Sequence, residues 1–306
     1  MPLGNYGVIK VTGADALSFL HNQLTQDFLN LSQNQARFCS FCNAKGRVQA
    51  TFIGLLNEQG EVLLITSSDL IVQTIKRLSM FVLRSKVKIV DASAEYNLTG
   101  FIGSNEVPKE ISPEHWSQYN QKTGGSTHHW ITLYPACGKP RYLRVSSLLN
   151  PSSPELAEPI GLSHDGKLND WDLSDILSGV CLIGLPTFES FVPQMINYES
   201  LEGVNFKKGC YPGQEVVARS QFRGAIKRRG FIISCASPIK DGQELFTSDD
   251  ISQPCGKIVR SCRTDQAYFA FASIQTKAEE ESTQIVTINL EQVFLHPLPY
   301  MLREDI

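Results

Sequence analysis

The chain of 306 residues is 42% hydrophobic and 19% charged, which is typical of a globular protein with room for two or three domains. Its formal net charge of −3 does not favour nucleic-acid binding over the whole surface, so such binding would need a local basic patch. The sequence shows no apolar run long enough to span a bilayer, and its start does not have the pattern of a signal peptide. Its eight cysteines have no short regular spacing. We therefore expect a cytoplasmic protein with reduced thiols and no membrane contact.

The N-terminal part reads as strand and then helix. Residues 6–11 alternate weakly and predict a strand. Residues 12–15 have the spacing of a helix capping box. Apolar residues then recur at helical spacing and predict one buried helix face: Leu17, Leu20, Leu24 and Phe28.

Residues 48–91 predict a β-β-α-β order. An apolar strand at 48–56 is followed by a hairpin turn at 57–60 and a returning strand at 62–66. A helix from Ser68 to about Val82 and a strand at 87–90 complete the unit. This order favours an α+β, ferredoxin-like arrangement.

Further strands are predicted at 98–102, 130–134 and 142–145. Residues 150–166 are rich in Pro, Ser and Gly and indicate a flexible crossing loop. Helical character resumes at 171–177, and Gly179 is placed to end that helix. From residue 228 onward, strand-like segments separated by turns fit a small β-barrel.

Cys210 is the candidate reactive thiol. It stands between Gly209 and Tyr211, and Pro212-Gly213 follow at once. Because Gly and Pro oppose a helix interior, we expect a tight, exposed turn leading into a strand or short helix from Gln214 to Arg219.

Cations outnumber acids around this thiol. Glu215 is the one acid among seven cations, and a positive field favours thiolate over thiol. The alternative is a packed structural cysteine beside a solvated basic face. The seven cations are Lys207, Lys208, Arg219, Arg223, Lys227, Arg228 and Arg229.

Other candidate sites are weaker. Cys39 and Cys42 have metal-ligand spacing but lack the further ligands that zinc needs, so we expect two semi-buried strand cysteines and no metal. His128 and His129 lie in a polar stretch that predicts a solvated loop. The phosphate loop and the dinucleotide fingerprint are both missing, so ATP and NAD are not supported.

The motif around Cys210 resembles that of a known family. Lys-Lys-Gly-Cys-Tyr-x-Gly-Gln-Glu at 207–215, followed by Val-Ala-Arg at 217–219, is similar to the signature of the YgfZ-type folate-binding proteins. These proteins are implicated in tRNA modification and iron–sulfur cluster maintenance and are relatives of the glycine-cleavage aminomethyltransferase (T-protein). The resemblance covers nearly the whole chain, with further motifs at 13–15, 23–27, 42–47, 191–194, 222–228 and 297–300.

The resemblance implies a T-protein-like α+β fold of three subdomains. A folate-binding region would cover residues 1–227 with a ferredoxin-like insert at about 40–120, and a β-barrel would cover 228–306. It implies that Tyr6 and Trp171 help to line a site for folate (tetrahydrofolate or a derivative), whose flat pterin ring aromatic walls can hold by stacking. It also implies that Cys210 is essential, with Lys207, Lys208, Gly209, Tyr211, Gly213, Gln214, Glu215, Arg219 and Arg223 supporting it.

Two departures from the relatives bear on this reading. The T-protein carries an acidic pair that serves aminomethyl transfer, whereas the matching stretch here, around Ala50 and Thr51, has no acid. Many relatives also have a glutamate where this chain has Leu177, so we do not expect a buried carboxylate to recognise the pterin as in those relatives, and we expect weak folate binding or a shifted binding mode.

Three functions remain open. The first is a folate-binding accessory protein whose partners are iron–sulfur enzymes, including those that modify tRNA. The second is a folate-dependent one-carbon (aminomethyl) transferase. The third is a module that docks on a protein or RNA through its basic face. Whether the chain catalyses a reaction, and whether it touches nucleic acid directly, stays open at this point.

Overall fold

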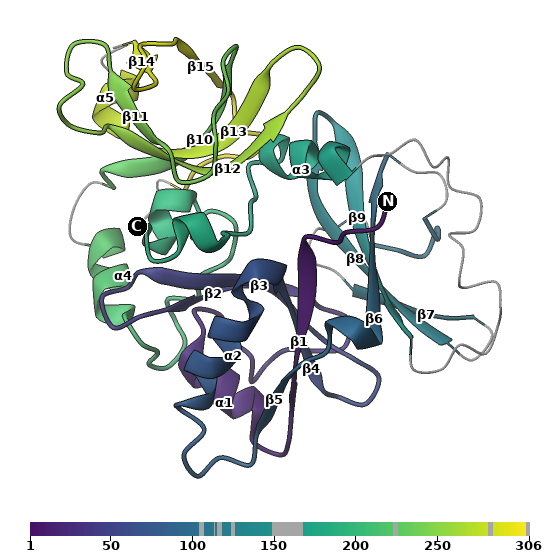
Figure 1. Cartoon of the computed structure of the whole chain (residues 1–306). Coiled ribbons are helices and arrows are strands. Elements are labelled where there is room, and N and C mark those ends of the chain that lie inside the picture. Colours follow the sequence, from purple (N-terminus) through teal and green to yellow (C-terminus); the bar gives the residue numbers. More distant parts are fainter. Residues whose placement is uncertain are drawn as a thin grey trace.

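The fold is taken from a computed structural model, which describes residues 1–103, 107–112, 114, 118–123, 126–148, 168–222, 226–280 and 284–303. Three sheets organise these residues, and Figure 1 shows them arranged around the helix α3 (Leu168–Leu177). This helix contacts β6 and β8 of one sheet and β12 and β13 of another. The junction at α3 is therefore the place where separate parts of the chain meet.

The first sheet has five strands in the order β2-β3-β4-β1-β5. Its element order confirms the predicted strands and the helix between them. The predicted N-terminal helix is shorter than expected, because it ends at Gln23 and leaves Leu24 and Phe28 beyond it. All nine residues of β3 are buried because both faces of the sheet are covered. The turn at 57–60 is closed by the Asn57 side chain, which accepts from the backbone N–H of Gln59 and Glu61. The elements are β1 (Tyr6–Thr12), α1 (Ala16–Gln23), β2 (Arg37–Cys42), β3 (Val48–Leu56), β4 (Val62–Ser67), α2 (Ile71–Ser79) and β5 (Lys88–Asp91).

The expected capping box before α1 is wrong. Asp15 makes no side-chain hydrogen bond to the helix. Its carboxylate instead accepts from the backbone N–H of Lys86 at 2.7 Å, and so it ties the helix start to the segment that enters β5. A partner distant in sequence has taken the place of the local one.

The second sheet has four strands in the order β6-β9-β8-β7. The three strands predicted between residues 98 and 145 are confirmed, but the solvated loop expected at His128 and His129 is wrong. Both histidines lie in β8 and are buried, with exposed fractions of 5% and 2%. The strands are β6 (Tyr96–Ile102), β7 (Gln118–Thr123), β8 (Ser126–Ala136) and β9 (Lys139–Ser147).

Burial of His129 makes the stability of the fold sensitive to acid. Burial lowers the pKa of His129 to about 4, so between about pH 6.5 and 4 the unfolded chain binds a proton that the folded chain does not. We expect stability to fall over this range, by up to about 3 kcal/mol from this residue. Unfolding free energies measured against pH should fall less steeply for His129→Gln than for the wild type, and parallel curves would contradict the expectation.

The third sheet is a six-stranded, nearly closed barrel in the order β14-β11-β12-β13-β10-β15. An isolated bridge between Val286 and Gln292 joins the segments near β14 and β15. The barrel has its own apolar core, separate from the larger core of the other two sheets. This confirms the predicted C-terminal barrel, whose elements are β10 (Arg228–Cys235), β11 (Glu244–Thr247), β12 (Gly256–Arg263), β13 (Tyr268–Gln275), α5 (Thr276–Glu280), β14 (Ile285–Val286) and β15 (Val293–His296).

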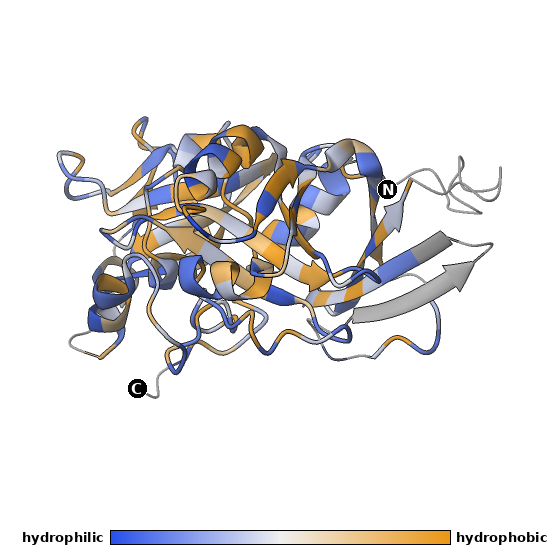
Figure 2. Ribbon diagram, turned by 90° about the horizontal axis from the view of Figure 1, so that it is seen from below, coloured by the Kyte–Doolittle hydropathy of each residue, from blue (hydrophilic) through white to orange (hydrophobic). Residues whose placement is uncertain are grey.

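Hydrophobic residues gather along the interior strands, as Figure 2 shows. The predicted end of α3 at Gly179 is confirmed, since this glycine adopts a φ of 67° and its N–H bonds back to the carbonyl of Ile176. The crossing loop predicted at 150–166 lies outside the described residues.

The domain boundaries at residues 40, 120 and 227/228 stay predictions. Strand pairing adds one fact about them, because β1 lies between β4 and β5 in the first sheet. The sheet of the ferredoxin-like part therefore includes the N-terminal strand. Among the described residues, no helix is long and apolar enough to cross a membrane.

Candidate functional site

Tyr6 and Trp171 line one cavity, although 165 positions separate them in sequence. Tyr6 begins β1, and Trp171 lies on α3 with only 1% of its surface exposed. The cavity holds about 20 Å³, which is room for about one water molecule. Its walls come from the first two sheets, α3 and the segment after it: Leu3, Tyr6, Phe38, Ile53, Leu133, Tyr134, Arg141, Leu143, Trp171, Asp175, Val180 and Leu182.

A buried carboxylate, Asp175, also lines this cavity. It stands four residues after Trp171 on α3, so both side chains project from the same helix face. The Tyr6 hydroxyl donates a hydrogen bond to it. Burial, together with the negative charge of Asp175, raises the pKa of Tyr6 well above its ordinary value. Tyr6 therefore stays a neutral donor.

Arg141 of β9 completes the group. Its guanidinium lies over the Trp171 ring, 4.6 Å from the ring centre, and pairs with Asp175. It also donates to the Ser178 hydroxyl at 2.9 Å, while its Nε has no hydrogen-bond partner among the described residues. Arg141 is only 1% exposed. Its guanidinium therefore covers one face of the Trp171 ring.

Sequence reasoning missed Arg141 and Asp175. The i, i+4 spacing of Trp171 and Asp175 on a predicted helix was the available signal for the acid. Leu177 is partly buried and does not line the cavity. The buried carboxylate that Leu177 does not provide is thus present two residues earlier.

The stretch that lacks the acidic pair is structural. Ala50 and Thr51 are fully buried in β3. The Thr51 hydroxyl accepts from the backbone N–H of Ile183 at 3.0 Å, which fixes the segment after α3 against the first sheet.

Cys210 lies on an exposed turn, as predicted. Gly213 has a φ of 80°, and a Cβ there would come within 2.7 Å of backbone atoms in the turn at residues 43–46, so only glycine fits. The chain then enters a short helix, α4 (Gln214–Phe222). Cys210 is not among the residues that line the Tyr6–Trp171 cavity.

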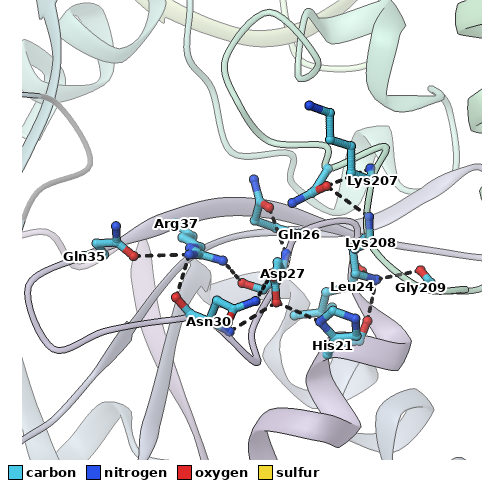
Figure 3. A network of polar contacts seen from close by, with 11 residues as sticks. His21, Leu24, Gln26, Asp27, Asn30, Gln35, Arg37, Lys207, Lys208 and Gly209 are labelled. Atoms are coloured by element: carbon cyan, nitrogen blue, oxygen red, sulfur yellow. Dashed lines mark hydrogen bonds and ion pairs between the residues drawn. The ribbon is translucent and has the colours of Figure 1, made fainter.

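Lys208 ties this turn to the first sheet's helix layer. Its ammonium donates to the carbonyls of His21 and Leu24 at the end of α1 (Figure 3). It also lies 4.6 Å from the centre of the Tyr211 ring. Burial lowers the pKa of Lys208 to about 8. Lys207, in contrast, is exposed. The two lysines therefore have different environments.

The other cations do not form one basic face. Arg219 pairs with Glu215 on the surface of α4, where such a pair contributes little. Arg228 donates to the carbonyl of Pro254, and Arg229 forms a buried pair with Glu199. Arg223 lies outside the described residues. The continuous basic run of the sequence is thus divided between surface and interior.

Cys39 and Cys42 are fully buried in β2, and burial raises the pKa of both thiols. Within the described part of the chain, no group of three or more His, Cys, Asp or Glu side chains is placed to hold a metal ion.

A larger polar cleft of about 680 Å³ lies next to the cavity, and Phe38 lines both. Its other walls include Asp27, Arg37 and Asn205. The Asn205 side chain accepts from the backbone N–H groups of Lys207 and Lys208. The loop that carries the two lysines therefore borders a cleft that shares a wall with the aromatic cavity.

Comparison with known proteins gives relatives along nearly the whole chain. The tRNA-modifying protein YgfZ of Edwardsiella ictaluri is 33% identical over 310 residues, covering 98% of this chain and 92% of that protein. The tRNA-modifying protein YgfZ of Photobacterium profundum is 29% identical over 280 residues, covering 90% and 80%. No family model matches the chain.

Among solved structures, the glycine cleavage system aminomethyltransferase T of Bartonella henselae superposes with a TM-score of 0.65 at 14% identity. The match covers 98% of this chain and 85% of that one. The likeness confirms the T-protein-like fold.

Proposed function

The chain belongs to the YgfZ family, and on that premise we propose that it is a folate-binding accessory protein that supports iron–sulfur enzymes and thereby tRNA modification. Cys210 is its essential thiol. The observation that carries the proposal is the convergence of Tyr6, Trp171 and Asp175 on one buried site. Two aromatic side chains and a carboxylate suit a flat ring system that carries N–H donors.

The residues fit a pterin chemically, but the site must widen to admit one. Pockets for ligands of this size hold about 300–1,000 Å³, against about 20 Å³ here. Withdrawal of Arg141 from the Trp171 ring would free both that ring and the Asp175 carboxylate. The Nε of Arg141 has no hydrogen-bond partner among the described residues, and a ligand acceptor could satisfy this buried donor. A bound tetrahydrofolate would supply a carrier for one-carbon units.

The alternative function as an aminomethyl transferase lacks the carboxylate that would move a proton on folate. The stretch at Ala50 and Thr51, buried within β3, offers no carboxylate to move a proton on folate. Docking through a basic face is also weakened, because Arg219 and Arg229 are engaged in ion pairs. Both points favour an accessory role.

We expect Trp171→Phe to weaken tetrahydrofolate binding several-fold and up to about tenfold, because the smaller ring offers less stacking area. Titration calorimetry on both proteins measures the change. Trp130→Phe is the matched control, because Trp130 packs against Phe101 in the second sheet and does not line the cavity. Absence of saturable binding to the wild type would defeat the proposal.

A further inference from the structure

A histidine that is 189 positions away in sequence faces the Cys210 turn. His21 lies in the last turn of α1, and its Nε2 is 3.6 Å from the position that a Cβ on Gly209 would occupy. Among the described residues, no other heavy atom outside the chain neighbours of Gly209 lies within 4 Å of that position. Gly209 is bonded directly to Cys210, so this ring nitrogen faces the backbone that leads into the thiol.

Asp27 fixes the orientation of the His21 ring. The Nδ1 of His21 is 2.9 Å from the Asp27 carboxylate, which also accepts from the backbone and side-chain nitrogens of Asn30 (Figure 3). Although burial opposes it, these hydrogen bonds lower the pKa of Asp27. A carboxylate at Nδ1 favours the tautomer that carries its proton there, which leaves the lone pair of Nε2 toward the Cys210 turn.

Lys208 holds the two segments together. It donates to the carbonyl of His21 itself and to that of Leu24. The side chain of Asn205 in turn caps the backbone of Lys207 and Lys208. The approach of His21 to the thiol turn is therefore supported on both sides.

We propose that His21, oriented by Asp27, accepts the proton of Cys210. The S–H bond breaks and an Nε2–H bond forms, the electron pair stays on sulfur, and the products are a thiolate and an imidazolium held by Asp27. No oxidant or reductant takes part. This proton transfer would make Cys210 a better nucleophile in the role proposed above. Only the biological purpose of the transfer, and not the transfer itself, depends on that proposed role.

Other charged groups surround the dyad. Asp27 lines the polar cleft of about 680 Å³, which gives the dyad a route for proton exchange with water. Lys208 interacts electrostatically with Asp27, Cys39 and Cys210, and Arg37 interacts with Asp27 and Cys39. The ammonium of Lys208 also faces the Tyr211 ring.

Alkylation with iodoacetamide tests the proposal. The reaction forms an S–C bond and releases iodide, and peptide mapping follows each cysteine separately. We expect His21→Gln to alkylate at Cys210 about tenfold more slowly than the wild type at pH 7. At pH 10, where free thiols are ionised, the two rates should converge. Cys137, which is also exposed, is the internal control in the same sample and should not change.

His296→Gln is the matched control variant, since His296 bonds Ser234 in the barrel, and it should leave Cys210 unchanged. Asp27→Asn should slow Cys210 less than His21→Gln does, and it carries the test if His21→Gln does not fold. Equal rates at pH 7, or the same slowing at both pH values, would overturn the proposal. Alkylation needs neither folate nor an iron–sulfur enzyme, so this result is independent of whether the proposed function holds.

Discussion

Replacing Asp175 with alanine is expected to lower the free energy of unfolding by about 3–5 kcal/mol, because the change leaves a buried charge without its partner. Arg141 is 1% exposed, and within the part of the chain that the structure describes one of its nitrogens already has no hydrogen-bond partner. Its remaining partners, the Ser178 hydroxyl and the Tyr134 carbonyl, are neutral and cannot compensate. Urea denaturation, with the midpoint and slope both fitted, measures the loss.

Two variants make this prediction specific. Asp172→Ala removes the same side chain from the same helix, but its ion pair with Arg260 is 4.0 Å long and partly exposed, and its other partner is the neutral side-chain amide of Asn5 at 2.7 Å. We therefore expect a smaller loss, of about 1–2 kcal/mol. In Arg141→Met/Asp175→Ala the unpaired charge is gone, and much of the stability should return. If the double variant is no more stable than Asp175→Ala, the loss has another cause.

The elements that sequence reasoning placed correctly are those with local signals. The strand β3 is a mostly apolar stretch of nine residues that ends at a turn whose Asn57 bonds its own hairpin, and Gly179 ends α3 through a backbone shape that glycine adopts easily. Such features depend on neighbouring residues only. The pairing of Tyr6 with Trp171 came instead from the family resemblance.

The charged residues of the site, Arg141 and Asp175, and the contact of His21 with the Cys210 turn could not be predicted from local sequence. Arg141 lies near the start of a strand that local sequence predicts, yet its partner is on a helix 34 positions later. His21 reaches Gly209 from even further away. Burial of His128 and His129 was likewise decided by the sheet in which they lie, while their polar neighbours indicated solvent. Tertiary packing, which local patterns do not encode, decides each of these cases.

Cys210→Ser is expected to fold normally and to abolish function. Cys210 is exposed on its turn, and surface substitutions of this kind usually change stability by less than about 0.5 kcal/mol. A hydroxyl is far less acidic than a thiol, so His21 cannot convert it into a comparable nucleophile or redox group. The activity of iron–sulfur enzymes, measured in cells that lack the protein and carry each variant, should not be restored.

Cys137→Ser is the matched control, because it makes the same change at the other exposed cysteine, and it should restore enzyme activity fully. Cys39→Ser and Cys42→Ser test the alternative thiols, although both are buried and need a stability measurement beside them. If Cys210→Ser restores activity as well as the wild type while a folded Cys39→Ser does not, the functional thiol lies in β2. Cys210 would then not be the thiol that the proposed function needs, whereas the alkylation of Cys210 would still report whether His21 accepts its proton.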